Sequence, residues 1–463
     1  MAGNAHTFTV GRSALRPIHA LLTLCLAASP VLGQAPPTEL RDYVAKEDKS
    51  FAWKLKGKTE SDAGVVYDLA LTSQTWQGHV WEHALQVIVP KGEKPQATML
   101  LWNQGGAPNA GSGVLGLTLA TKIGAPVAFL YGVPKQPLYD GKREDAQIAE
   151  TFVRYLETKD ASWPLLFPMV KSVVRAMDAV QAFTKEEWKF DVTKFVVTGA
   201  SKRGWTSWLT AATGDKRVKA IAPLVIDTLN MPQQMKNQVA AFGKPSEMIK
   251  DYVERNLVPI PDTPEARKLW TMIDPWVYRD QIKVPVMMIN GANDPYWPLD
   301  ALNSYWGDLK CDKNVCYVPN AGHDLRETDT NGKKDVFPTR GVNALAAFAK
   351  CQIFDKPMPT VTWKLTPTAT GGEVETVVDE EWKVVRKWTA SSSTRDFRNA
   401  RWTSEVLSEK SRRPVGIPGR ETRQYIWKSP IKDFRAVFIE TEYEVDGLPF
   451  SLSSGIQILE AKK

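Results

Sequence analysis

The chain is poor in the residues that most often bind metals. Its 463 residues include five histidines and four cysteines. The cysteines after residue 33 are Cys311, Cys316 and Cys351, and they form neither a CxxC motif nor a Cys/His spacing typical of a zinc site. We therefore expect no metal and no cofactor. In an oxidising compartment, Cys311 and Cys316 could close a small disulfide loop and leave Cys351 free.

Long apolar runs and blocks of like charge are also missing. No stretch reaches eighteen apolar residues, the length that a membrane-spanning helix needs. Lys and Arg outnumber Asp and Glu by 59 to 52, but the excess is spread along the chain, which gives little support to nucleic-acid binding. With 43% hydrophobic and 24% charged residues, the composition excludes disordered and fibrous proteins and is that of a globular one.

Residues 1–33 have the pattern of a cleaved secretory signal peptide. Arg12 and Arg16 precede an apolar run from Ala20 to Ala28, and the small residue Gly33 follows before Gln34. An uncleaved amphipathic anchor is the alternative. The signal-peptide interpretation predicts a secreted or periplasmic protein with no stable membrane insertion after cleavage.

Apolar strand-like segments alternate with amphipathic helical ones through the middle of the chain. We expect strands buried on both faces at 97–104, 126–133, 194–200, 218–227 and 284–292, and helices at 162–183 and 341–354. This alternation predicts an α/β fold with a mostly parallel sheet. Residues 34–95 have shorter alternating runs that would extend one sheet edge with antiparallel strands.

The same patterns predict the domain organisation. An α/β domain would span 34–356, interrupted at about 228–283 by a helical insertion long enough to form a lid. After a linker at 356–359, residues 357–463 show the alternation of an antiparallel β-sandwich.

Ser201 occupies the most distinctive motif of the sequence. In KFVVTGASKRGWTSWL, a strand runs into a turn of small residues that holds Ser201, and a helix begins near Lys202. This layout is typical of a nucleophile elbow, in which a tight strand-to-helix turn exposes the serine hydroxyl. Gly204 stands one position later than in the usual G-x-S-x-G, and Arg203 takes the usual glycine position. The alternative is a serine that caps an ordinary helix.

A serine nucleophile needs a base, and few histidines can provide it. His79 and His83 precede the parallel strands and are expected to be structural or surface residues. His323 follows a late strand, and Asp294 follows the strand before it. The chain order Ser201, Asp294, His323 is that of α/β-hydrolase triads. Asp227, at the end of the preceding strand, is the rival acid.

Two backbone segments could stabilise an oxyanion. We expect one N–H from Lys202 and a second from the loop that holds Gly105 and Gly106, where glycine permits a close backbone approach. A plain glycine-rich turn is the alternative for that loop. The side chains of Lys202 and Arg203 could supply positive charge to an oxyanion or a substrate carboxylate, or could simply be solvated.

The residues also carry a family resemblance. LTSQTW, WEHALQVIVP, GAPNAG, QPLYDGKREDAQ, GASKRGWTSWL, IDPWVYRDQI and FIETEYEVDG are spread over about residues 40–460. In these segments the chain resembles the PhoPQ-activated pathogenicity-related (PqaA-type) family, a relative of the α/β hydrolases. The resemblance implies an exported α/β-hydrolase fold with Ser201, Asp294 and His323 in the catalytic positions and a C-terminal β domain. It implies little about the substrate, because the family is named for virulence-associated regulation.

Two functional hypotheses follow. In the first, the protein is a serine hydrolase that cleaves a small-molecule ester or peptide through an acyl-enzyme. An esterase is preferred, because no carboxylate cluster that would bind a free amino terminus stands out. Arg203 could bind substrate, and aromatic side chains near the motifs could line a pocket: Trp102, Trp205, Tyr296 and Trp297. In the second hypothesis, the protein is a catalytically silent secreted binding or signalling protein that keeps the fold.

Overall fold

The computed structural model describes residues 1, 3, 35–368, 371–379, 381–407, 412–414, 420–428 and 432–461. Nearly the whole predicted signal peptide lies outside these residues, so export stays a prediction. Residues Pro36–Lys463 form one compact unit. Among the described helices, none is both long and apolar enough to cross a bilayer.

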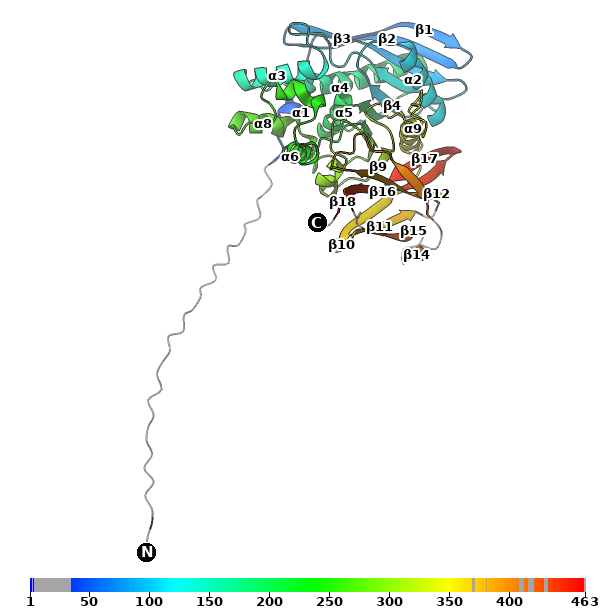
Figure 1. The fold of residues 1–463 in the computed structure, drawn as a ribbon. Helices are drawn as coiled ribbons and strands as arrows, with labels where there is room; N and C mark the ends of the chain where they lie inside the picture. Colours follow the sequence, from blue (N-terminus) through cyan, green and yellow to red (C-terminus); the bar gives the residue numbers. More distant parts are fainter. Residues whose placement is uncertain are drawn as a thin grey trace. The chain divides into compact units, whose positions relative to one another are not determined.

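A nine-stranded mixed sheet organises the unit, in the order β1-β2-β3-β5-β4-β6-β7-β8-β9 (Figure 1). The first three strands pair antiparallel, β3 pairs antiparallel with β5, and the strands from β5 to β9 run parallel. This confirms the predicted α/β architecture and its antiparallel edge. The strands are β1 Ala52–Ser61, β2 Gly64–Trp76, β3 His79–Pro90, β4 Thr98–Asn103, β5 Val127–Leu130, β6 Lys194–Ala200, β7 Val218–Leu224, β8 Val286–Gly291 and β9 Lys313–Val318.

The parallel strands are mostly apolar because both of their faces are covered. Every residue of β4, β5 and β8 is buried. Two predicted strands end three residues early. Strand β5 ends at Leu130 and not at Val133. Strand β7 ends at Leu224 and not at Asp227, because Val225 has φ 46° and turns the chain out of the sheet. Asp227 therefore lies in a loop beyond the strand.

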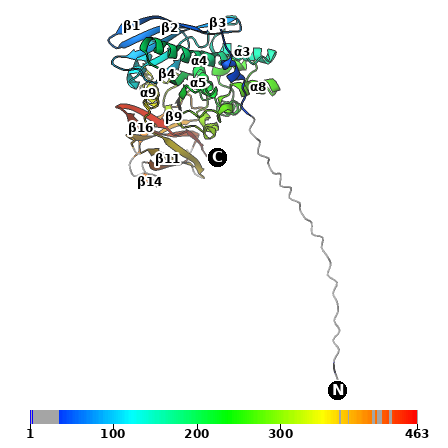
Figure 2. The same cartoon turned by 180° about the vertical axis from the view of Figure 1, so that it is seen from behind.

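Helices pack against both faces of the sheet (Figures 1 and 2). One face carries α1 Glu39–Ala45, α3 Glu144–Thr158, α4 Leu166–Phe183 with the π-helical turn Thr184–Trp188, and α5 Lys202–Ala212. The other face carries α2 Ala110–Ile123 and α9 Thr339–Ile353. Helices α4 and α9 correspond to the two helices that the apolar spacing predicted.

The insertion between β7 and β8 is helical, as predicted. It contains α6 Met231–Phe242, η2 Glu247–Ile249, α7 Lys250–Val253, α8 Pro264–Ile273 and η3 Pro275–Tyr278. Asp274 joins its two ends, because its carboxylate accepts hydrogen bonds from the backbone N–H groups of Met231 and Trp276 at 2.7 and 2.9 Å. Burial raises the pKa of Asp274 to about 6, against the lowering effect of these bonds.

Two antiparallel sheets follow α9, as the sequence predicted for this region. One has the order β10-β11-β15-β14, and the other has β13-β12-β16-β17 with β18 paired to β16. They share a small core that contains Val374, Val385 and Ile439. Strand β17 packs on α9 and β9, so these sheets adjoin the far edge of the large one. The strands are β10 Val361–Thr368, β11 Gly371–Asp379, β12 Val384–Ser392, β13 Thr403–Val406, β14 Arg412–Pro414, β15 Arg420–Lys428, β16 Phe434–Val445, β17 Leu448–Ser453 and β18 Gln457–Glu460.

The three cysteines of the unit are buried free thiols. The suggested disulfide between Cys311 and Cys316 is not formed. Cys316 lies inside β9 and Cys311 lies just before it, and an extended chain places residues five apart much farther from each other than the ~7 Å that a disulfide spans between Cα atoms. Burial raises the pKa of Cys316 to about 12 and that of Cys351 to about 11.

Candidate active site

Ser201 lies at a strained turn between β6 and α5. Its backbone has φ 58° and ψ −127°, a conformation that costs a non-glycine residue about 1–3 kcal/mol. Its backbone N–H donates to the carbonyl of Leu224 at 2.8 Å, which ties the turn to the neighbouring strand. The Ser201 hydroxyl does not cap α5. The helix-cap alternative is therefore wrong, and the geometry is that of a nucleophile elbow.

Two glycines make this tight turn possible. A Cβ on Gly199 would lie 2.8 Å from the Cβ of Arg203, and a Cβ on Gly204 would lie 2.9 Å from the carbonyl oxygen of Gly199. Helix α5 therefore packs directly on the end of β6. The shift of the second glycine by one position leaves room for Arg203, whose long side chain turns toward the loop after β4.

Asp294 and His323 meet above the ends of β8 and β9. The carboxylate Oδ2 of Asp294 lies 2.7 Å from Nδ1 of His323, and its Oδ1 accepts the backbone N–H of Tyr296 at 2.9 Å. The Asp294 side chain is 9% exposed and the His323 side chain 25%. A carboxylate bonded to Nδ1 fixes the ring so that Nε2 is the nitrogen free to accept a proton.

The surroundings of His323 keep that second nitrogen available. Nε2 is buried and has no hydrogen-bond partner in the described part of the chain. The ring of Tyr296 stacks on the imidazole with centroids 4.2 Å apart. Tyr296 also lines the cavity that contains Ser201, so this ring connects the histidine with that cavity, while Nε2 and the Ser201 hydroxyl are not hydrogen-bonded to each other.

Asp227, the rival acid, does not contact His323. Its carboxylate accepts a hydrogen bond from the Tyr305 hydroxyl and one from the Asn290 amide at 3.3 Å. Burial raises the pKa of Asp227 to about 7, and the negative charge of Asp294 adds to the effect, while the Tyr305 hydrogen bond opposes it. The acid that the structure places against the histidine is Asp294.

The raised pKa of Asp227 predicts a loss of stability with rising pH. Between pH 4 and 7 the unfolded chain releases this proton and the folded chain keeps it, so the free energy of unfolding falls by up to about 1.4 kcal/mol per pH unit. In Asp227→Asn this contribution disappears. Urea unfolding of both proteins at pH 4.5, 5.5 and 6.5 measures the difference. Parallel pH dependences of the two proteins would contradict the prediction.

The glycine loop after β4 faces the arginine of the elbow. A Cβ on Gly105 would lie 2.2 Å from a terminal nitrogen of Arg203, so a larger residue here would displace the guanidinium. Gly106 has φ 68° and its carbonyl accepts the N–H of Gly132 at 2.7 Å. Helix α5 begins at Lys202, whose N–H is among the first four that lack a partner inside the helix. The oxyanion role of Lys202, Gly105 and Gly106 stays a prediction.

The side chains of Lys202 and Arg203 are neither solvated nor free to bind an anion. Arg203 forms a two-pronged ion pair with Glu144 at 2.7 and 2.8 Å and donates to the carbonyl of Val133. Lys202 Nζ lies 3.0 Å from Glu144 and 3.0 Å from Asp145. Burial alone would raise the pKa of Glu144, but the hydrogen bonds and charge of Arg203, with the charge of Lys202, hold it well below its usual value.

Glu144 and Asp145 were not predicted as site residues. Glu144 and Asp145 open helix α3, about sixty residues before the elbow. The signal that could have found them is the adjacent pair Lys202-Arg203 at a buried helix start, because buried cations require carboxylate partners. Asp145 also accepts a hydrogen bond from the Tyr252 hydroxyl of the insertion at 3.1 Å.

A mostly apolar cavity of about 540 Å³ opens beside Ser201. Of the four predicted pocket aromatics, Trp205, Tyr296 and Trp297 line it. Trp102 does not, because it is buried in the core, stacks on Phe129 and donates to Gln104. Arg203 is absent from the lining as well, contrary to its expected substrate contact. The other lining residues are Asp145, Lys202, Ile226, Thr228, Met231, Met235, Ile249, Tyr252, Val258 and Trp270.

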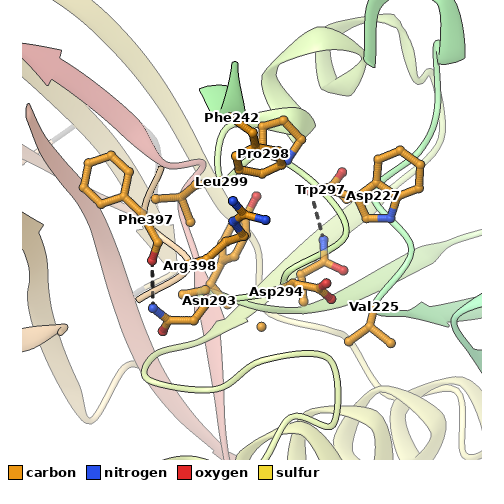
Figure 3. A pocket seen from close by; sticks show the side chains of 14 residues that line it. Val225, Asp227, Phe242, Asn293, Asp294, Trp297, Pro298, Leu299, Phe397 and Arg398 are labelled. Carbon is orange, nitrogen blue, oxygen red and sulfur yellow. Dashed lines mark hydrogen bonds between the residues drawn. The ribbon is translucent and has the colours of Figure 1, made fainter. Parts of the chain in front are cut away.

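A second cavity, of about 400 Å³, lies next to the acid. Asp227, Asp294 and Trp297 line it together with Phe397 and Arg398 from the C-terminal sheets. Figure 3 shows the side chain of Asn293 turned toward Phe397, next to Asp294. Trp297 belongs to both cavities and separates them.

The two other histidines in the described part of the chain, His83 and His79, have partners of their own outside this site. His83 is buried, bonded to Ser73 and to the carbonyl of Tyr131, and burial lowers its pKa to about 4. His79 contacts the ring of Tyr139. Within the described ranges, no three His, Cys, Asp or Glu side chains gather as metal ligands.

Comparison with known proteins identifies relatives of the whole unit. The model of the PhoPQ-activated pathogenicity-related protein family matches residues 40–398. Autocrine proliferation repressor protein A of Dictyostelium discoideum is 31% identical over 452 residues, which cover 91% of this chain and 88% of that protein.

Solved structures similar to this one include two esterases. Acetyl xylan esterase 1 from Thermoanaerobacterium sp. JW/SL YS485 is 15% identical with a TM-score of 0.47, over 70% of this chain and 95% of that one. An S-formylglutathione hydrolase from Agrobacterium tumefaciens is 14% identical with a TM-score of 0.43, over 65% and 99%. The fold of this chain, a mixed α/β fold with a mostly parallel sheet, a helical insertion and C-terminal antiparallel sheets, rests on its own sheet topology and agrees with what the sequence predicted.

Proposed function

The chain belongs to the PhoPQ-activated pathogenicity-related protein family, and we propose that it is an exported serine hydrolase that cleaves carboxylic esters. One observation carries the proposal. A serine on a strained elbow borders an apolar cavity, and Tyr296 of that cavity's lining stacks on a histidine that a buried aspartate holds. The signal-like residues 1–33 support export to the periplasm or the exterior.

The proposed reaction has two halves. Ser201 Oγ attacks the ester carbonyl carbon while His323 Nε2 takes the hydroxyl proton, and Asp294 stabilises the resulting imidazolium. The tetrahedral oxyanion is held by the N–H of Lys202 and an N–H of the Gly105-Gly106 loop. Its collapse breaks the carbon–oxygen bond, and the alcohol leaves with the proton from His323. Water then attacks the acyl-enzyme in the same way, which releases the acid and restores Ser201.

The charges around the cavity favour an ester over a peptide with a free amino terminus. A peptidase that reads an amino terminus needs a carboxylate available to it. The two acids near Ser201, Glu144 and Asp145, are already paired with Arg203 and Lys202. The rest of the lining is mostly apolar, which suits an uncharged acyl or alkyl group.

Filling the cavity should change the preference for acyl length. Met235 on α6 lines the cavity. Because a larger side chain there would occupy the space for a long acyl group, we expect Met235→Trp to lower kcat/KM for p-nitrophenyl octanoate roughly tenfold or more. The kcat/KM for p-nitrophenyl acetate should change much less. Val239→Trp on the same helix is the control, because Val239 is exposed and outside the lining. Equal losses for both esters would argue against this cavity as the acyl site.

Covalent labelling tests the hydrolase proposal directly. The purified protein is incubated with a fluorophosphonate, its intact mass is measured, and the adduct is mapped by peptide digestion. We expect one adduct, on Ser201, because only an activated serine reacts quickly. Failure of the folded protein to label would reject the proposal.

The second hypothesis, a silent secreted signalling protein, has one observation in its favour. The Dictyostelium relative is named as an autocrine proliferation repressor. A signalling protein does not require a strained serine or a histidine with a free Nε2. Labelling separates the two hypotheses, because a silent protein would keep its fold and leave Ser201 unmodified.

A further inference from the structure

The loop that carries the catalytic acid is bonded to the C-terminal sheets. Asn293, the residue before Asp294, donates its amide to the carbonyl of Phe397 at 3.0 Å and to the carbonyl of Ala400 at 2.7 Å. Both carbonyls belong to residues 395–402, the last part of the connection between β12 and β13, which we call the brace segment. Figure 3 shows the first of these bonds at the edge of the second cavity.

The loop that carries the histidine is bonded to the same segment. Asn320, three residues before His323, accepts the backbone N–H of Trp402 at 2.8 Å and donates to the carbonyl of Trp402 at 3.0 Å. Asn320 has φ 55°, a left-handed conformation that asparagine tolerates better than most residues. The paired bonds fix the loop at the point where it leaves β9.

The two loops are also joined to each other, next to the brace segment. The backbone N–H of Asn293 donates to the carbonyl of Ala321 at 2.9 Å. The indole ring of Trp402 is buried and donates to the carbonyl of Ala292 at 3.4 Å. The acid loop, the histidine loop and the brace segment therefore form one hydrogen-bonded layer behind the Asp294–His323 pair.

The brace segment reaches the helical insertion as well. Arg398 pairs with Glu247 at 3.0 Å, and its guanidinium lies 4.2 Å from the ring centroid of Phe242. Arg395 pairs with Asp300, a few residues after the acid, at 2.6 Å. These are partly exposed ion pairs, so the hydrogen bonds of Asn293 and Asn320 are the stronger constraint on the loops.

We propose that Asn293 and Asn320 are positioning residues that hold the acid and histidine loops against the brace segment, so that the C-terminal sheets complete the active site. The inference rests on the proposed hydrolase function for its catalytic consequence. Neither asparagine touches the reacting atoms. They act through the alignment of the Asp294–His323 pair, and a displacement of about 1 Å in such a pair can cost about a hundredfold in rate.

Asn293→Ala tests the proposal, with Asn303→Ala as the matched control. Asn303, on η4 Ala301–Ser304, also donates its amide to a backbone carbonyl of the C-terminal region, that of Ile456, at 2.8 Å. Its side chain is not bonded to the acid loop or the histidine loop. A second variant, Asn320→Gly, removes both bonds to Trp402 and tolerates the positive φ of that position. If Asn293→Ala does not fold, Asn320→Gly alone tests the proposal.

The measurements are kcat and KM for a p-nitrophenyl ester, the rate of fluorophosphonate labelling, and hydrogen exchange of residues 292–296 and 319–325. We expect Asn293→Ala and Asn320→Gly to lower kcat and the labelling rate about ten- to a hundredfold with little change in KM, and to speed exchange in both loops. Asn303→Ala should change none of these, although it loses a bond of the same kind.

Several outcomes would overturn the inference. If the asparagine variants match Asn303→Ala in kcat and in loop exchange, the bonds have no positioning role. A loss confined to thermal stability would show a structural role only. If wild-type Ser201 does not label, the hydrolase proposal fails, and hydrogen exchange alone then decides whether the brace segment holds the two loops.

Discussion

Replacing Ser201 with alanine is expected to lower kcat for ester hydrolysis by about six orders of magnitude. Loss of the nucleophile removes the covalent route and leaves only the residual effect of the oxyanion site and substrate binding. The variant should also form no fluorophosphonate adduct. Stopped-flow and long-term assays with a p-nitrophenyl ester, compared with intact-mass labelling, measure both effects.

The elbow geometry supplies a control for this variant. Alanine keeps the strained backbone at φ 58° and loses only a hydroxyl that does not cap α5, so the free energy of unfolding should change little. Ser201→Gly should be equally inactive but more stable by roughly 1 kcal/mol, because glycine adopts this conformation without strain. Substantial turnover by either folded variant would exclude Ser201 as the nucleophile.

Replacing Asp294 with asparagine is expected to lower kcat by about four orders of magnitude. The carboxylate Oδ2 lies 2.7 Å from His323 Nδ1, and an amide there no longer stabilises the imidazolium or fixes the productive tautomer. The measurement is kcat for the same ester, with circular dichroism to verify the fold. Labelling by the fluorophosphonate should slow in proportion.

Asp227→Asn is the matched control for the acid. Asp227 is buried and lines the same cavity as Asp294. Its carboxylate accepts hydrogen bonds from Tyr305 and Asn290, and it has none with His323. We expect its kcat to stay within about tenfold of the wild type, an amount typical of a residue that acts only through packing. If Asp227→Asn instead loses more activity than Asp294→Asn, the two acids have exchanged roles and the assignment made from the static geometry is wrong.

The fold was largely predictable because its signals are local. Buried parallel strands carry continuous apolar runs, so β4, β6 and β8 could be recognised without knowing their neighbours. The boundary of β7 could not, because Val225 leaves the sheet with φ 46°, a conformation rarely adopted by β-branched residues. The predicted disulfide was wrong because Cys311 and Cys316 are close in sequence but not in space. The extended chain at the start of β9 separates them.

The candidate site also has a part that local sequence signals predict and a part that they do not. Ser201, Asp294 and His323 each follow a strand end, and parallel strand ends share one edge of the sheet, so sequence order alone predicted that the three would gather. The adjacent cations Lys202 and Arg203 could have indicated that carboxylate partners exist, but not which acids these are. Lys202 and Arg203 find their carboxylates on α3, and Trp102 is directed into the core by Phe129.

The sequence by itself thus determined the α/β architecture, the helical insertion, the C-terminal strands and the residues of the candidate triad, because periodicity, turn chemistry and histidine scarcity act along the chain. Only the tertiary structure decided which cavity faces Ser201, which side chains neutralise Lys202 and Arg203, and how Asn293 and Asn320 reach the brace segment. Those contacts join residues some sixty to more than a hundred positions apart. Hydrogen bonds and ion pairs act over a few ångströms, so such partners become visible only when the packed elements bring them together.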